Sequence, residues 1–125
     1  MPQISDVFII DVSGKINYRN TKHCVCISLS ENKYLLVNTN HREMYDDFQI
    51  RSSEYDFLGG MDRFISCHRI HEFSFDRIIK KVGNLNYDDI AKIVDKIQKS
   101  RTLDKIDKDS VIPDLDKWLS DNSSQ

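Results

Sequence analysis

Hydrophobic residues come in short, often β-branched runs over roughly the first seventy positions of the chain. Polar stretches separate five such runs: VFIIDV at 7–12, CVCISL at 24–29, KYLLVNT at 33–39, a start at 48–50 and RFISCHRI at 63–70. Runs of this length and composition predict β-strands. The unbroken apolar centre of 33–39 predicts a strand buried on both faces. Gly59 and Gly60 predict a turn before the last of these strands.

The period of the pattern changes after residue 85. Four aliphatic residues then follow the i, i+3, i+4, i+7 spacing of a helix: Ile90, Ile93, Val94 and Ile97. Asn86 and the acids after it form an N-terminal cap, so we predict an amphipathic helix from about Tyr87 to Ser100. A polar link leads to a short second helix over 113–119, which begins with a proline. The tail 121–125 is expected to be disordered.

Strands followed by a helix predict an α+β domain. We expect a small curled antiparallel sheet or barrel of about five strands with the amphipathic helix packed on it. The 125 residues fit one domain. Residues 1–100 carry 14 Lys/Arg and 14 Asp/Glu, whereas 101–125 carry 4 and 6 and supply the whole net charge of −2. We therefore expect a sheet-and-helix unit over 1–100 and an acidic C-terminal extension over 101–125.

Composition excludes several classes of protein. No stretch approaches the ~20 apolar residues of a membrane helix, and the start of the chain lacks the pattern of a signal peptide. The odd set of Cys24, Cys26 and Cys67 indicates a reducing compartment and predicts small buried side chains, so we expect a cytoplasmic protein without a membrane segment. No zinc-type spacing and no phosphate-binding glycine loop is present, so we expect neither a metal nor a cofactor.

Three polar patches are candidates for chemistry. The loop at 15–23 places cations beside an aromatic ring, which suits phosphate contacts and base stacking; its candidates are Lys15, Tyr18, Arg19, Lys22 and His23. A strand end at 39–42 offers a hydroxyl, an imidazole and a guanidinium for an anionic transition state: Thr39, His41 and Arg42. The third patch holds His68, Arg69 and His71. A solvated loop, a capped strand end and structural histidines are the alternative interpretations.

Two stretches carry a family resemblance. The order of strands and helix, with MDRFISCHRIHEF at 61–73 and IIKKVGNLNYDDIAKIVDKI at 78–97, resembles the PemK/MazF family of toxin endoribonucleases. The resemblance implies an SH3-like curled sheet, a homodimer, an antitoxin as protein partner, and metal-free cleavage of single-stranded RNA by attack of a ribose 2′-hydroxyl. Lys22 stands where this family has an arginine, and Thr39 lies at its threonine-bearing strand end. Ser66 and His68 replace an Arg-x-Asp pair of some members.

The resemblance therefore implies catalytic roles for Lys22, His41 and His68. It implies RNA contacts from Lys15, Tyr18, Arg19, His23, Thr39, Arg42 and Arg69. Two alternatives stay open. Either His41 and His68 take over the acid–base work of an endoribonuclease, attenuated or not, or the chain is an inactive nucleic-acid- or protein-binding module. Cleavage requires Lys22, His41 and His68 to converge with Arg19 or Arg42 on one concave face.

Overall fold

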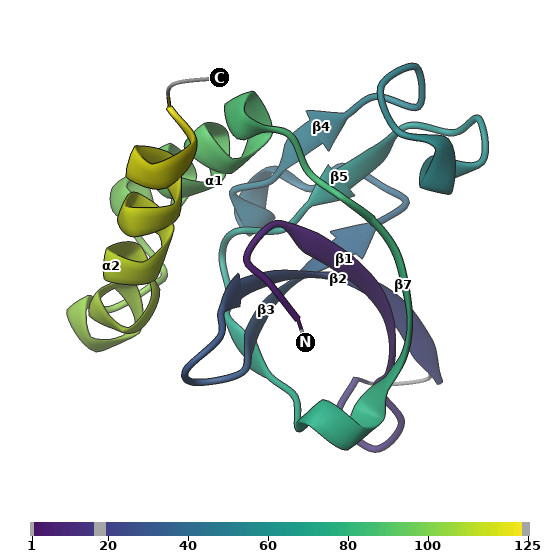
Figure 1. Ribbon diagram of the computed structural model, residues 1–125, viewed down its shortest axis with the longest axis horizontal. Coiled ribbons are helices and arrows are strands. Elements are labelled where there is room, and N and C mark those ends of the chain that lie inside the picture. Colours follow the sequence, from purple (N-terminus) through teal and green to yellow (C-terminus); the bar gives the residue numbers. More distant parts are fainter. Residues whose placement is uncertain (1, 17–19, 124–125) are drawn as a thin grey trace.

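The fold is a strongly curled antiparallel sheet with two helices on one side of it (Figure 1). It was obtained as a computed structural model, which describes residues 2–16 and 20–123. The described strands are β1 (Asp6–Asp11), β2 (Thr21–Ser28), β3 (Lys33–Asn38), β4 (Phe48–Ile50), β5 (Arg63–Ile65), β6 (His71–Glu72) and β7 (Ile78–Asn84). The helices are α1 (Tyr87–Lys99) and α2 (Lys105–Asn122), with single 3₁₀ turns η1 (Glu43–Tyr45), η2 (Asp56–Leu58) and η3 (Phe75–Arg77). The predicted α+β class is confirmed.

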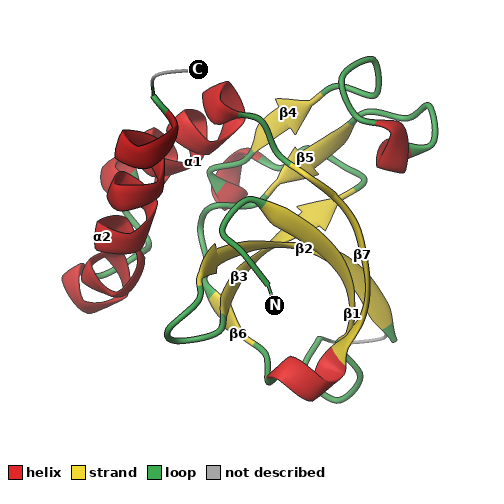
Figure 2. Ribbon diagram, viewed as in Figure 1, coloured by secondary structure: helices red, strands yellow, loops and turns green. Residues whose placement is uncertain are grey.

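The strands pair in the order β4-β5-β3-β2-β1-β7, and β6 pairs with the other end of β3. The path ends at β4 and at β7, so within the described residues the sheet curls without closing into a hydrogen-bonded barrel (Figure 2). The sequence pattern indicated about five strands and missed β6 and β7. β7 has the sequence IIKKVGN and pairs with β1 through two register shifts, so it lacks the regular alternation that marks a strand.

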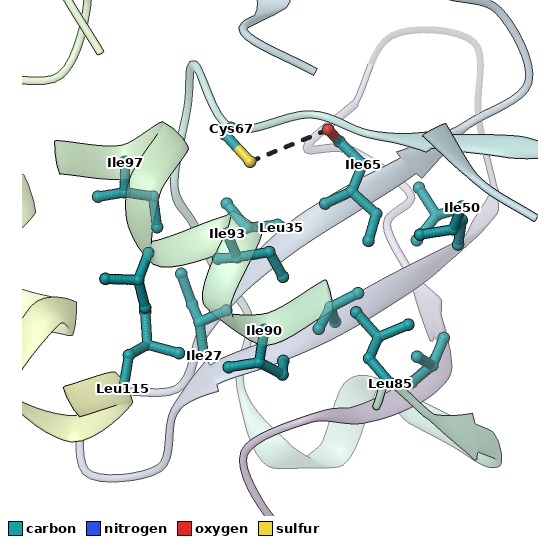
Figure 3. Close-up of a cluster of buried hydrophobic side chains, with 14 of the residues drawn as sticks. Ile27, Leu35, Ile50, Ile65, Cys67, Leu85, Ile90, Ile93, Ile97 and Leu115 are labelled. Atoms are coloured by element: carbon teal, nitrogen blue, oxygen red, sulfur yellow. Dashed lines mark hydrogen bonds between the residues drawn. The ribbon is translucent and has the colours of Figure 1, made fainter. Parts of the chain in front are cut away.

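Apolar side chains are buried on both faces of the sheet. One cluster lies between the sheet and the helices, and Figure 3 shows Ile90, Ile93 and Ile97 of α1 beside Leu35. The second cluster lies inside the curl: Phe8, Ile10, Val12, Cys24, Cys26, Tyr34 and Phe73. Because Tyr34 and Leu35 are successive residues of β3 in different clusters, the prediction of a strand buried on both faces is confirmed.

The amphipathic helix forms almost as the sequence predicts. The Asn86 side chain accepts a hydrogen bond of 2.9 Å from the Asp89 N–H, which caps α1. Each fully buried isoleucine contributes about 1.5–3 kcal/mol to the burial energy. The second helix is longer than predicted, since α2 begins at Lys105 and contains Pro113 in its interior. Val111 and Leu115 of α2 are fully buried in the same core as α1, which holds this segment in place.

The predicted strand over 63–70 is wrong in its second half. β5 ends at Ile65, which pairs with Val37, and β6 begins at His71, which pairs with Tyr34. The five residues 66–70 therefore stand opposite only Leu35 and Leu36 of β3. The extra residues must arch away from the sheet, as in an extended β-bulge. We call residues 66–70 the arch; the third polar patch of the sequence lies on it and just after it.

Two smaller sequence expectations can also be compared with the structure. Gly59 and Gly60 have φ angles of 65° and 86°, which favour glycine and confirm the predicted turn. Cys24, Cys26 and Cys67 are buried, as predicted. None of the helices in the described part of the chain has the length and apolar character required to cross a membrane.

Candidate active site

Lys22 and Asn38 form the centre of the candidate site. The antiparallel register of β2 and β3, with Cys24 opposite Leu36, places Lys22 opposite Asn38 on the same face. The Lys22 Nζ donates a hydrogen bond to Asn38 Oδ1. Phe64 of β5 pairs with Asn38 from the other side. Lys22 is thus half-buried at the end of the strand and held by Asn38.

A hollow of about 200 Å³ opens beside this pair. It is lined by Lys22, Val37, Asn38, Thr39, Asn40, Arg42 and Tyr45. The ammonium of Lys22, the guanidinium of Arg42 and the hydroxyl of Thr39 thus converge on one space. Two cations and a hydroxyl suit an oxyanion such as a phosphate. We call this space the Lys22 hollow.

His68 reaches the Lys22 hollow through Tyr45. Its ring stacks on the Tyr45 ring, with centroids 4.2 Å apart and planes 7° apart. Its Nδ1 lies 2.7 Å from Ser66 Oγ, so the Ser66 hydroxyl fixes the imidazole. Burial lowers the pKa of His68 below its usual value, because the imidazolium would lose solvation. The ring is therefore neutral at pH 7 and can accept a proton.

His71 lies just after the arch and is largely buried. Burial, and then the charges of Arg69, His68 and Lys22, lower the pKa of His71 to about 4. His71 stacks on Phe73 with centroids 5.9 Å apart, and the Lys15 ammonium lies 5.9 Å from the centroid of the same Phe73 ring. Lys15 and His71 therefore both lie next to Phe73.

His41 is held in a different way. Its Nδ1 lies 2.5 Å from Asp47 Oδ1, and the Arg42 N–H donates to Asp47 Oδ2 at 2.9 Å. The buried Asp47 carboxylate thereby fixes the loop that carries both residues. The His41 ring packs 5.6 Å from Phe64, the cross-strand partner of Asn38. A carboxylate at Nδ1 leaves Nε2 to exchange protons, as in catalytic triads.

The remaining predicted RNA-contact residues are dispersed. His23 alternates with Lys22 along β2, so it faces the other side of the sheet, where it stacks on Phe57. Lys15 donates to the Glu72 carbonyl, and Arg69 is exposed on the arch. Tyr18 and Arg19 lie outside the described residues. The structure thus brings Lys22, Thr39 and Arg42 to one hollow. His68 stacks on Tyr45 of its wall, and His41 packs on Phe64 outside the lining.

Sequence reasoning missed three residues that organise this site, and it named Ser66 without its contact to His68. The three are Asn38, Tyr45 and Asp47. Strand alternation alone could have found Asn38, because it follows from the β2–β3 register. The roles of Tyr45 and Asp47 depend on where the loop after β3 folds back, and no local pattern encodes that.

The three buried cysteines are not reactive groups of this site. Burial raises the pKa of both Cys24 and Cys26 to about 12 and raises the pKa of Cys67 further, so none is a thiolate at neutral pH. Within residues 2–16 and 20–123, no three His, Cys, Asp or Glu side chains are grouped so that they could hold a metal ion.

Comparisons with known proteins give a likeness of structure but none of sequence. No protein-family model matches the chain. No curated protein matches it by sequence. Among solved structures, it is similar to an endoribonuclease in complex with its cognate antitoxin from a mycobacterial species. The TM-score is 0.60 at 17% sequence identity, over 83% of this chain and 98% of that chain.

At this identity the likeness shows the fold alone. The chain is therefore a domain with the fold of that endoribonuclease, and it has a hollow lined by the two cations Lys22 and Arg42. The narrower PemK/MazF resemblance stays a prediction.

Proposed function

We propose that the chain is a toxin-like endoribonuclease of the PemK/MazF kind that cleaves single-stranded RNA without a metal ion. The observation that carries the proposal is the Lys22 hollow, where Lys22, Arg42 and Thr39 converge at the end of β3. The fold shared with a solved endoribonuclease supports it.

The reaction needs a base, an acid and positive charge at the phosphate. In the proposed step the ribose 2′-oxygen loses its proton to His68 and bonds to the adjacent phosphorus. The bond from phosphorus to the 5′-oxygen breaks, and His41 supplies a proton to that oxygen. Lys22 and Arg42 stabilise the extra negative charge of the pentacoordinate phosphate. The products are a 2′,3′-cyclic phosphate and a 5′-hydroxyl end.

The neutral state of His68 supports its role as the base. A lowered pKa leaves its ring unprotonated at pH 7, and stacking on Tyr45 fixes the direction of the ring. The link from Asp47 to Nδ1 supports the role of His41, because it leaves Nε2 for the substrate. In this proposal the Thr39 hydroxyl, which lines the hollow, donates to a phosphate oxygen.

The test is cleavage of a mixed-sequence single-stranded RNA by the purified chain in EDTA. We expect a cyclic phosphate product, and a fall in rate of about 10²- to 10⁴-fold for Lys22→Ala, His41→Ala and His68→Ala. Lys99→Ala is the matched control, because Lys99 is exposed and paired with Asp95 on the far helix. Intact RNA after long incubation with the wild-type chain, or equal rates in all variants, would refute the proposal.

A second candidate is an inactive binding module of the same fold. It is favoured by the hydrogen bonds that already engage Lys22 Nζ and His68 Nδ1. In that case the chain shifts RNA in a salt-dependent manner without cutting it. A pure protein-interaction role would give a stable protein complex and no RNA shift.

A protein partner and a homodimer belong to the same proposal. The similar endoribonuclease was solved with its cognate antitoxin, so we propose that a small inhibitory protein binds this chain. Co-expression with neighbouring reading frames, followed by chromatography with light scattering, would give both the partner and the number of copies. A monomeric chain that binds none of the co-expressed proteins would count against both the homodimer and the inhibitory partner.

A further inference from the structure

A second hollow lies across the end of β2 and β3 from the Lys22 hollow. Its volume is about 170 Å³, and it is lined by Thr21, Lys22, His23, Val37, Thr39, Phe57, Leu58 and Arg63. Lys22, Val37 and Thr39 line both hollows. A strand of nucleic acid that passes over the end of β2 and β3 can therefore contact both hollows. We call the second one the aromatic pocket.

Two flat rings form one wall of the aromatic pocket. The His23 and Phe57 rings lie 19° from parallel with centroids 6.4 Å apart. Leu58 is buried and adds an apolar contact. Aromatic surfaces next to a strand of nucleic acid serve as platforms for bases, since every base has a π-face.

The Phe57 ring is held in place by the sheet. A Cβ at Gly83 of β7 would lie 2.5 Å from Phe57 Cδ1, so the ring occupies the space that only glycine leaves. The Tyr55 ring also packs on the Phe57 ring, with centroids 5.4 Å apart. Few alternative ring positions remain, and a platform fixed in advance loses little entropy when a base binds.

Charge around the aromatic pocket also fits a nucleotide. The ladder of β7, β1 and β2 places Lys80 opposite Ile9 and Ile9 opposite His23. Burial, then the charges of Arg63 and Lys80, lower the pKa of His23. The His23 ring is therefore neutral at pH 7 and suited to stacking. Arg63 lines the same pocket and adds a positive charge that suits a phosphate.

We propose that the aromatic pocket binds one unpaired base of the RNA, beside the phosphate held in the Lys22 hollow. This inference rests on the proposed function, because it takes RNA as the ligand, but it does not require that the RNA is cleaved. A space of 170 Å³ is well below the ~300–1,000 Å³ of pockets for drug-sized ligands, so it suits one planar base. Thr39, which lines both hollows, lies where the two nucleotides join.

The test compares two uncleavable probes with equal charge. One is a 2′-O-methyl RNA decamer of mixed sequence, and the other is the same backbone without bases. Fluorescence anisotropy gives their affinities, and the ratio isolates the contribution of the bases. We expect His23→Ala and Phe57→Leu to lower this ratio, and His23→Ala to do so by about 5- to 150-fold. His23→Tyr, which keeps a flat ring, should restore most of it.

Phe75→Leu is the matched control, because Phe75 is 56% exposed and lies outside both hollows. Circular dichroism confirms that each variant is folded. An unchanged ratio in both His23→Ala and Phe57→Leu, or equal binding of both probes by the wild-type chain, would overturn the pocket. Base-dependent binding that these variants reduce, without cleavage of natural RNA, would support the pocket and refute the catalytic proposal. Cleavage of natural RNA together with an unchanged affinity ratio would support the catalytic proposal and refute the pocket.

Discussion

His41 and His68 have the same side chain and different neighbours. His41 is oriented by the buried Asp47 carboxylate, whereas His68 lies between the Ser66 hydroxyl and the Tyr45 ring. These partners, rather than the histidines alone, set how each ring is oriented and which of its nitrogens is free. Substitution of these partner residues therefore tests the proposed roles of His41 and His68.

The pH dependence of cleavage tests the role of His68. Because its pKa is lowered and a base must be neutral, the acidic limb of the rate profile should lie below pH 6.5. Tyr45→Leu removes the stacked ring, admits water to the imidazole, and should move the limb toward pH 6.5. Single-turnover rates between pH 4.5 and 8 measure both. A limb above pH 6.5, or one that Tyr45→Leu leaves in place, would contradict this assignment.

His71 should make the fold less stable in acid. Its folded-state pKa is about 4, so between pH 6.5 and 4 the unfolded chain binds a proton that the folded chain excludes. Stability therefore falls as the pH drops through that window and is constant with respect to this group outside it. The neighbouring charges are Lys22, His68 and Arg69.

We expect His71→Leu to reduce this loss by an amount on the order of 1 kcal/mol, once the partial exposure of the ring is discounted. Urea unfolding of both proteins at pH 4, 5, 6 and 7 gives the difference. Parallel stability curves for the two proteins would show that His71 does not titrate in this way.

At the scale of elements, close approaches between strands and loops position both hollows. The arch exists because β3 pairs with β5 at one end and with β6 at the other. The Ser100 hydroxyl donates to Asp46 Oδ2 at 3.0 Å, and the Thr102 hydroxyl donates to the His68 carbonyl at 3.2 Å. The link between α1 and α2 thus holds the arch and the loop that carries Tyr45.

The approach of β7 to η2 predicts a specific coupling. Gly83→Ala places a methyl group against the Phe57 ring and should destabilise the fold by about 1–3 kcal/mol. In a Phe57→Leu background the smaller side chain leaves more room, so the same change should cost at least about 0.5 kcal/mol less. A double-mutant cycle by thermal or urea unfolding measures this coupling energy. Strictly additive effects would show that the ring does not meet β7 in solution.

At the scale of the whole molecule, two layers share one core. α1 and α2 cover one side of the curled sheet (Figure 1), and Val111 and Leu115 of α2 enter the core cluster of the strands. The segment that composition marked as an acidic extension therefore contributes apolar burial to the fold. Its charged residues remain on the outside, as the exposed Lys105–Asp109 and Lys117–Asp121 pairs show.

The contribution of α2 can be measured with one pair of leucines. Leu115→Ala should cost about 2–5 kcal/mol of unfolding free energy, because the side chain is fully buried. Leu29 is 48% exposed, so Leu29→Ala should cost much less. Urea unfolding of both variants measures the difference. Equal costs would mean that α2 does not pack on the sheet as described.

The local pattern was enough for much of the fold. The apolar runs predicted β1, β2 and β3, and the spacing of Ile90, Ile93 and Ile97 predicted α1, because alternation and helical period are properties of neighbouring residues. β7 and the first half of α2 were not predicted. Lys80 and Lys81 interrupt the apolar pattern of β7, and the polar link shows no helical period. Both elements depend on packing against the rest of the core. Propensity is a weak guide where tertiary packing decides.

The sequence by itself determined that Cys24 and Cys26 share one face of a strand, and that cations and histidines are concentrated in three patches. The predicted loop at 15–23 is wrong at its end, because β2 begins at Thr21 and places Lys22 on the strand. Only the tertiary structure decided which of the cations and histidines meet. It placed Tyr45 against His68, Phe57 against His23, and Arg42 beside Lys22. These contacts join residues far apart in the chain, and they are set by strand register and by the arch, which follow from burying both faces of the curled sheet.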